Sequence, residues 1–232
     1  MRSSVRQSAQ MPIVGMLHKQ PKQAPNSCRS RGKTLADKSL VIACGALANE
    51  IFAIKAMNDW DHFDVQCLDA KLHNRPSLIA PKLEEVINAR GKDYKHILIG
   101  YADCGSSGDI DALVNSDARL ERLKGPHCFS FFLGEIEFET LSDETPGTFW
   151  LTDFLVRHFD SMVIKNLGLD THPELRDVYF GNYTDLIYLS QRHDESLINA
   201  AEVCAEQLGL SFRHIHTGFG TFEQALTIKE IA

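Results

Sequence analysis

From residue 39 onward, short apolar runs alternate with longer amphipathic segments, and this alternation limits the fold more than any other feature. Residues 40–44 predict a buried strand, and 47–57 follow with apolar residues at helical spacing. The same order recurs at 63–68 with 77–87, at 96–101 with 108–114, and at 186–189 with 195–208. Such repetition predicts an α/β fold, a mostly parallel sheet with helices on both faces in Rossmann-like layers.

The segment between the third and fourth of these pairs is harder to assign. Residues 127–133 suit either a strand or a helix, and the acidic stretch 135–144 predicts a helix. Apolar residues at helical spacing over 149–167, followed by Gly168, predict one long helix. A last strand is expected at 210–214.

Charge divides the chain into two unlike parts. The whole sequence has 24 Lys and Arg against 31 Asp and Glu, but residues 1–38 contain eight of the basic residues and one acidic residue. Because 1–38 also lack periodicity, we expect a disordered basic N-terminal segment followed by a single α/β domain over 39–232. That domain has 16 basic and 30 acidic residues, a net charge of −14, which disfavours nucleic-acid binding.

The apolar runs and the cysteines indicate the compartment. No run approaches the roughly 20 apolar residues that cross a bilayer, so we expect no membrane association. The five cysteines after residue 38 form an odd set without the spacing of a disulfide framework, which favours the reducing cytoplasm. Cys67 and Cys204 suit small buried core positions. Exposed edges of the predicted sheet also lead us to expect a homodimer.

Thiols and imidazoles follow successive predicted strands. Cys44 ends the first strand, His73 follows the second, Cys104 follows the third, and Cys128 lies in the next connection. Because parallel strands bring their carboxyl ends to one edge, we expect these four side chains to converge there. Cysteine and histidine are ligands for zinc and iron, so we predict a zinc or iron site at this edge.

Polar neighbours of these ligands are the predicted catalytic residues. Asp103, Arg75 and Tyr101 could orient a small anionic or amine substrate, and His127 could serve as a base or as a further ligand. The turn Gly105, Ser106 and Ser107 precedes a predicted helix, where backbone NH groups could hold an anionic cofactor. Neither a Walker loop nor a GxGxxG fingerprint is present.

Further polar residues have a structural interpretation beside a functional one. His214 and His216 alternate at the end of the last predicted strand, so they should face one side of the sheet. Asp153 near a predicted helix start suits capping as well as catalysis. The remaining candidates are Glu50, Thr148, His172 and Tyr183.

Six motifs resemble the DUF1638 family over 39–226. They are Cys-Gly-Ala-Leu at 44–47, Leu-His-Asn-Arg-Pro at 72–76, Tyr-Ala-Asp-Cys-Gly at 101–105, Gly-Pro-His-Cys at 125–128, Pro-Gly-Thr-Phe-Trp-Leu-Thr-Asp-Phe at 146–154 and Thr-Gly-Phe-Gly at 217–220. Family members occur beside genes for corrinoid-dependent methylamine methyltransferases. The resemblance therefore implies methylamine or one-carbon metabolism and a corrinoid methyl-transfer protein as a partner. Ala102 stands where the family commonly has Gly.

Three functions fit these observations. The first is a metal-dependent enzyme that acts on a small molecule by transfer, elimination or hydrolysis. The second is a non-catalytic metal or cofactor carrier for corrinoid methyl transfer, which a closed four-ligand site would favour. The third is a metal-free enzyme in which Cys104 or Cys128 is the nucleophile and His127 the base.

Overall fold

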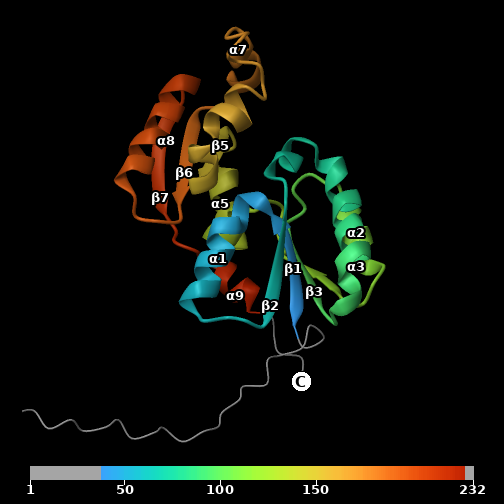
Figure 1. Ribbon diagram of the computed structural model, residues 1–232. Coiled ribbons are helices and arrows are strands. Elements are labelled where there is room, and N and C mark those ends of the chain that lie inside the picture. Colours follow the sequence, from blue (N-terminus) through green and yellow to red (C-terminus); the bar gives the residue numbers. More distant parts are fainter. Residues whose placement is uncertain (1–37, 228–232) are drawn as a thin grey trace, which may run out of the picture. The chain divides into compact units, whose positions relative to one another are not determined.

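Two parallel sheets form the framework of the protein (Figure 1). The computed structural model describes residues 38–227, all of which fall within one compact unit. The predicted disordered segment lies outside the described residues, apart from Lys38. Every strand pairing is parallel, and helices cover the sheets, so the predicted α/β class is confirmed. The strands form two separate sheets, where the sequence led us to expect one.

The first sheet has four strands in the order β2-β1-β3-β4. They are β1 (Ser39–Cys44), β2 (Phe63–Leu68), β3 (Ile97–Gly100) and β4 (Leu120–Arg122). Central strands β1 and β3 are almost wholly buried, as their continuous apolar sequences predict. The short strand β4 escaped sequence analysis because Leu120–Arg122 offers three residues with one buried side chain.

Helices pack on both faces of the first sheet. Figure 1 shows α1 (Ala48–Met57) and α9 (Phe222–Leu226) on one side, and α2 (Ile79–Arg90) and α3 (Asp109–Asn115) on the other. Val41 and Ala43 contribute to the core beneath α1 and α9, whereas Leu40 and Ile42 contribute to the core beneath α2. Because α9 comes after the second sheet in the chain, the chain returns to the first core before residue 227.

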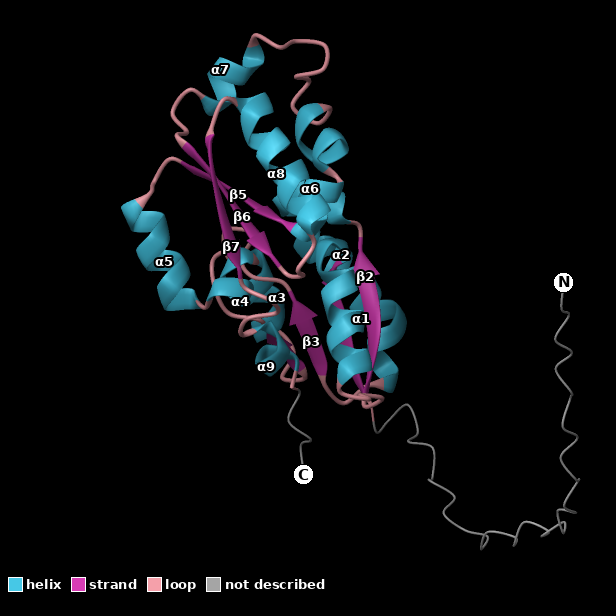
Figure 2. Ribbon diagram, turned by 90° about the vertical axis from the view of Figure 1, so that its left-hand side faces the viewer, coloured by secondary structure: helices cyan, strands magenta, loops and turns pink. Residues whose placement is uncertain are grey.

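The second sheet has three strands in the order β5-β6-β7. They are β5 (Thr148–Thr152), β6 (Asp185–Ser190) and β7 (Ser211–His216). Figure 2 shows α5 (Glu135–Glu144) on one side of it, and α6 (Asp153–Arg157) and α8 (Glu195–Leu208) on the other. The other two helices are α4 (Phe129–Leu133) and α7 (Leu175–Phe180), and short 3-10 turns occupy Gly45–Leu47, Ala70–Asn74, Pro76–Leu78 and Gly91–Asp93.

The α8 helix illustrates a correct prediction, and 149–167 an incorrect one. Asp194 caps α8 by accepting from the backbone NH groups of Ser196 and Leu197, and Gly209 ends it in the left-handed conformation. By contrast, 149–167 is not one long helix. Its first residues form β5, because the β-branched and aromatic side chains of 148–152 suit a strand beside β6. Helix α6 and a π-helical turn at Asp160–Ile164 follow.

No helix among residues 38–227 is both long and apolar enough to span a membrane. All five cysteines that the structure describes are free thiols.

Candidate functional site

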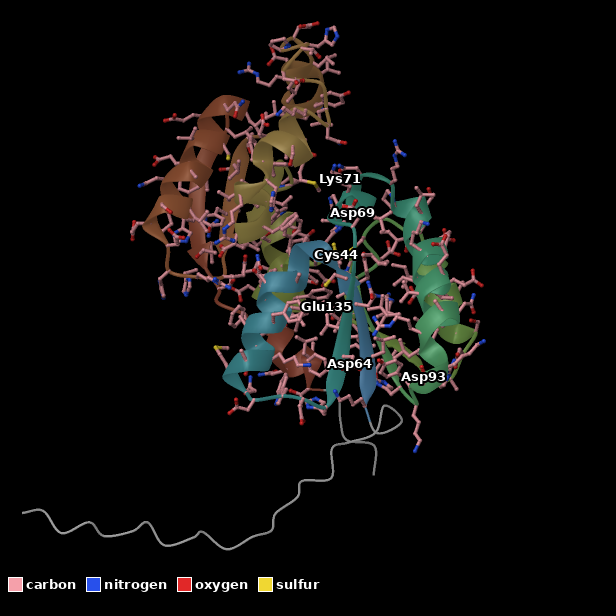
Figure 3. All side chains as sticks on the ribbon, in the orientation of Figure 1. Cys44, Asp64, Asp69, Lys71, Asp93 and Glu135 are labelled. Carbon is pink, nitrogen blue, oxygen red and sulfur yellow. The ribbon has the colours of Figure 1, made fainter. Side chains whose placement is uncertain are left out.

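Three cysteines lie at the carboxyl edge of the first sheet. Cys44 is the last residue of β1, Cys104 follows β3 closely, and Cys128 directly precedes α4. In Figure 3, Cys44 lies at one end of the sheet, with Asp69 and Lys71 near it and Asp64 toward the opposite end. Parallel strands therefore deliver thiols from three connections to one place, as the ligand rule for open parallel sheets predicts.

The three thiols line one pocket, which we call the thiol pocket. His73 and the Tyr101 side chain share it, and its far wall comes from Thr152, Phe154, Leu155 and Met162. The free space inside is about 40 Å³. Among the described residues that line the pocket, none is Asp, Glu, Lys or Arg. Sulfur atoms and one imidazole are thus surrounded by a mostly apolar wall.

A tight turn fixes Cys104 in this pocket. The Asp103 carboxylate accepts hydrogen bonds from the Ser106 hydroxyl (3.0 Å) and the backbone NH groups of Gly108 (3.1 Å) and Gly105 (3.2 Å). Cys104 and Ser107 both have positive φ, 50° and 57°, which side chains other than Gly adopt at a cost. Because the carboxylate closes this turn and does not line the pocket, its observed role is to position Cys104.

Backbone hydrogen bonds join the turn to the connection that carries Cys128. The backbone NH of Asp103 donates to the Gly125 carbonyl (3.1 Å), and the backbone NH of Cys104 donates to the Pro126 carbonyl (2.9 Å). Gly125 has a φ of 109°, and a Cβ there would lie 2.4 Å from the Ser130 hydroxyl oxygen, so only Gly fits. Cys104 and Cys128 are therefore held by one hydrogen-bonded unit.

Burial makes all three thiols weak acids. It raises the pKa of Cys104 to about 12, with a smaller contribution from the neighbouring Cys44. Burial likewise raises the pKa of Cys44, and it raises that of Cys128 well above the ordinary value, with Cys104 and Cys44 adding to the effect. Since a nucleophilic cysteine requires a lowered pKa, these surroundings give no support to a free thiolate nucleophile.

The Tyr101 hydroxyl is a buried polar group beside the Cys44 thiol. Tyr101 is only 2% exposed. Burial raises the pKa of Tyr101, and the neighbouring Cys44 thiol adds to the rise. Tyr101 and Cys44 therefore share one side of the thiol pocket.

The other predicted site residues lie around the pocket and do not line it. His127 lines a neighbouring cleft, although it is close enough to His73 to lower the pKa of that imidazole, after the larger effect of burial. Arg75 lines a separate hollow with Asp69 and Lys71. The predicted anion cradle of Gly105, Ser106 and Ser107 instead bonds to Asp103, in part through the backbone NH of Gly105 and the hydroxyl of Ser106.

As the side chains stand, no three His, Cys, Asp or Glu residues of 38–227 are grouped so as to hold a metal ion. A single ion bound by Cys44, Cys104 and Cys128 would therefore require the thiols to move toward one centre.

Sequence analysis did not foresee the far wall of the thiol pocket. Phe154, Leu155 and Met162 belong to the region that was predicted as one long helix, and their contact with the thiols depends on how β5 and α6 pack. Phe129 was also missed. It borders the thiol pocket and two further clefts, as His73 does.

A polar network occupies the carboxyl edge of the second sheet. The buried Ser190 hydroxyl lies 2.8 Å from His214 Nε2 and 2.9 Å from His216 Nδ1. Both imidazoles thus face one side, as alternation along the strand predicts. Because the hydroxyl has a single hydrogen, at most one of the two ring nitrogens accepts from it, and at least one ring nitrogen donates to it.

A buried acidic pair lies near this network. Asp153, fully buried, accepts from the Tyr188 hydroxyl (2.7 Å) and the backbone NH of Gln191 (3.0 Å). Glu50 is 2% exposed, and one of its carboxylate oxygens has no hydrogen bond. Burial raises the pKa of Glu50, and Asp153 adds to that rise. The pair shows that α1 and α6 approach each other beside the thiol pocket.

The remaining candidates have local structural roles. Thr148 donates to the Thr145 carbonyl, and His172 lies 3.2 Å from Glu174 on the surface. Tyr183 packs on Phe149 and Phe180.

Comparison with known proteins identifies the family. The model of the family described as protein of unknown function DUF1638 matches residues 67–226. The chain belongs to the DUF1638 family. The match includes His73, Tyr101, Cys104 and Cys128, whereas Cys44 precedes it. No curated protein and no solved structure matches the chain.

Proposed function

We propose that this DUF1638 protein is a metal-dependent enzyme that acts on a small molecule at the thiol pocket. Cys44, Cys104 and Cys128 would hold the metal, and His73 would lie at the entrance as a fourth ligand or a proton carrier. The supporting observation is that three connections of one sheet bring three thiols into a single pocket free of charged side chains. The free thiols at the described cysteines support the cytoplasm as the compartment.

With His73 as a proton carrier, the three thiols are the only protein ligands and a coordination position stays open, which is typical of catalytic rather than structural zinc. With His73 as a fourth ligand the site would be closed, as the carrier function requires. Iron offers a second arrangement, because an iron–sulfur cluster takes each thiolate on a different iron atom. Such a cluster accepts thiols that are farther apart than those around one zinc ion. Bound metal would supply Lewis-acid activation of a small substrate for a transfer, elimination or hydrolysis step.

The residues of the chain have separate tasks in this proposal. Asp103 holds the turn that presents Cys104, and the Tyr101 hydroxyl beside Cys44 would hydrogen-bond a molecule bound at the thiols. The apolar far wall excludes bulk water, which strengthens polar interactions inside. Arg75 and His127 are too far out to line the pocket, so we assign neither to direct contact with the metal.

The test compares Cys104→Ser with Cys204→Ser, each purified without an affinity tag, chelator or oxygen. Cys204 is also a buried thiol, but it lies on α8 in the core of the second sheet and does not line the thiol pocket. We expect bound zinc or iron in the wild type and in Cys204→Ser, and loss of the metal in Cys104→Ser with the fold retained. Equal metal content in the two variants would overturn the ligand assignment.

A further inference from the structure

The thiol pocket adjoins a wider cleft, which we call the outer cleft. His73 and Phe129 border both spaces, so the outer cleft and the thiol pocket lie next to each other. The outer cleft is lined by His73, Pro126, His127, Phe129, Phe138, Glu139, Ser142, Asp143 and Trp150. A molecule that reaches the thiols from this side passes these residues.

Three aromatic side chains in the outer cleft pack into one cluster. The ring centroids of Phe138 and Trp150 are 5.2 Å apart, and Phe129 lies 6.3 Å from each of them. Aromatic faces carry partial negative charge and attract cations that have lost part of their water. The cluster therefore offers both apolar contact and a preference for positive charge.

The charged side chains of the outer cleft have the same preference. Glu139 and Asp143 are one turn apart on α5, and both are exposed. Of the described residues that line the outer cleft or the thiol pocket, none is Lys or Arg. Since the chain from residue 39 onward also has a net charge of −14, anions are repelled and cations are drawn toward the cleft.

Ser142 lies between Glu139 and Asp143 on α5 and also lines the outer cleft. Its hydroxyl oxygen is closed to solvent, so we assign it no contact with a ligand. The aromatic cluster and the two carboxylates together match an ammonium group with apolar substituents.

We propose that the outer cleft binds an organic cation, an ammonium compound with apolar substituents, as the substrate class of this protein. The inference rests on the proposed function in taking the cleft as the approach to the thiol pocket. It does not depend on which metal the thiols hold. Phe129, Phe138 and Trp150 would contact the substituents, while Glu139 and Asp143 would balance the charge.

The test uses two probes of the same shape. Choline carries a quaternary ammonium group, and 3,3-dimethylbutan-1-ol is its neutral counterpart with carbon in place of nitrogen. Binding of each to the full chain is measured by calorimetric titration at low salt. We expect choline to bind about ten-fold more tightly than the neutral alcohol, as for a cation on partly desolvated rings.

Two variants with the same change in net charge locate the site. Glu139→Gln/Asp143→Asn removes both carboxylates that line the outer cleft, whereas Glu137→Gln/Glu144→Gln removes two on the same helix that do not line it. The first should lose most of the preference for choline and the second should keep it. All four side chains are exposed, so neither variant should unfold the protein.

Equal binding of choline and the neutral alcohol would overturn the inference, and so would equal loss in the two double variants or no binding of choline. Tighter binding of the anion 3,3-dimethylbutanoate would also overturn it. The metal content of the same samples is measured in parallel. Loss of choline binding with normal metal content would contradict only this inference, whereas absence of metal with normal choline binding would contradict only the proposed function.

Discussion

Removal of the Asp103 carboxylate should loosen the turn that presents Cys104. Three hydrogen bonds are lost in Asp103→Ala, to the Ser106 hydroxyl and to the backbone NH groups of Gly105 and Gly108. At about 1 kcal/mol each, reduced because the turn is partly exposed, the loss in the free energy of unfolding is about 2 kcal/mol. For a domain of this size, the melting temperature should fall by about 4 to 8 °C.

The isosteric variant separates the contributions of the two carboxylate oxygens. Asn at 103 keeps an oxygen that can accept from Ser106 and Gly108, and it loses the oxygen that accepts from Gly105. Asp103→Asn should therefore lose only about 1 kcal/mol. Thermal unfolding gives the stability, and the reaction of Cys104 with a thiol reagent should be faster in Asp103→Ala than in Asp103→Asn, because the turn opens more often.

The pH dependence of stability gives a second measure of the same turn. Burial alone would raise the pKa of Asp103, but the hydrogen bonds from Gly108, Ser106 and Gly105 outweigh it and lower the pKa. These hydrogen bonds therefore stabilise the folded protein fully above the ordinary carboxyl pKa of about 4. The stabilisation is lost as the pH falls through the lower pKa that Asp103 has in the folded protein. Wild-type stability and thiol reactivity in Asp103→Ala would refute the positioning role.

Two further predictions concern the cores beside the site. Burial raises the pKa of Glu50, so ionisation opposes folding as the pH rises above the ordinary value of about 4.3, and Glu50→Gln should be more stable than the wild type at pH 8 by about 1 kcal/mol. A urea titration at pH 4 and pH 8 checks this, and a destabilised variant at pH 8 would contradict it. Phe222 is fully buried in the core of the first sheet, so Phe222→Ala should lose about 3 to 5 kcal/mol. A loss of less than about 1 kcal/mol in the free energy of unfolding, measured by chemical denaturation, would show that α9 does not belong to that core.

Sequence periodicity predicted the fold wherever local signals agreed with burial. The strand β6 and the helix α8 were found because an apolar run is followed by an amphipathic segment that ends at Gly209. Residues 149–152 were misassigned because Phe149 and Leu151, taken with Phe154 and Leu155, also fit helical spacing. Pairing with β6 decides in favour of a strand, and pairing is a tertiary effect that periodicity does not contain.

The candidate site was predictable in part for the same reason. Parallel strands meet at one edge, so the approach of Cys44 and Cys104 follows from their positions at the end of β1 and after β3. Cys128 was expected in the next connection, although the strand β4 that precedes it was missed. The direction in which His127 and Arg75 point depends on the conformation of their connections, and the structure places both outside the thiol pocket. The far wall of the pocket depends on how the segments around the second sheet pack.

X-ray absorption at the edge of the bound metal tests the central proposal most directly. For zinc in the thiol pocket, three sulfur neighbours at about 2.3 Å are expected. Iron should show sulfur neighbours as well, with iron neighbours beyond them if the thiols hold a cluster. A bound metal surrounded only by nitrogen and oxygen, or protein without stoichiometric metal when it is prepared without oxygen and chelators, would contradict the assignment of Cys44, Cys104 and Cys128.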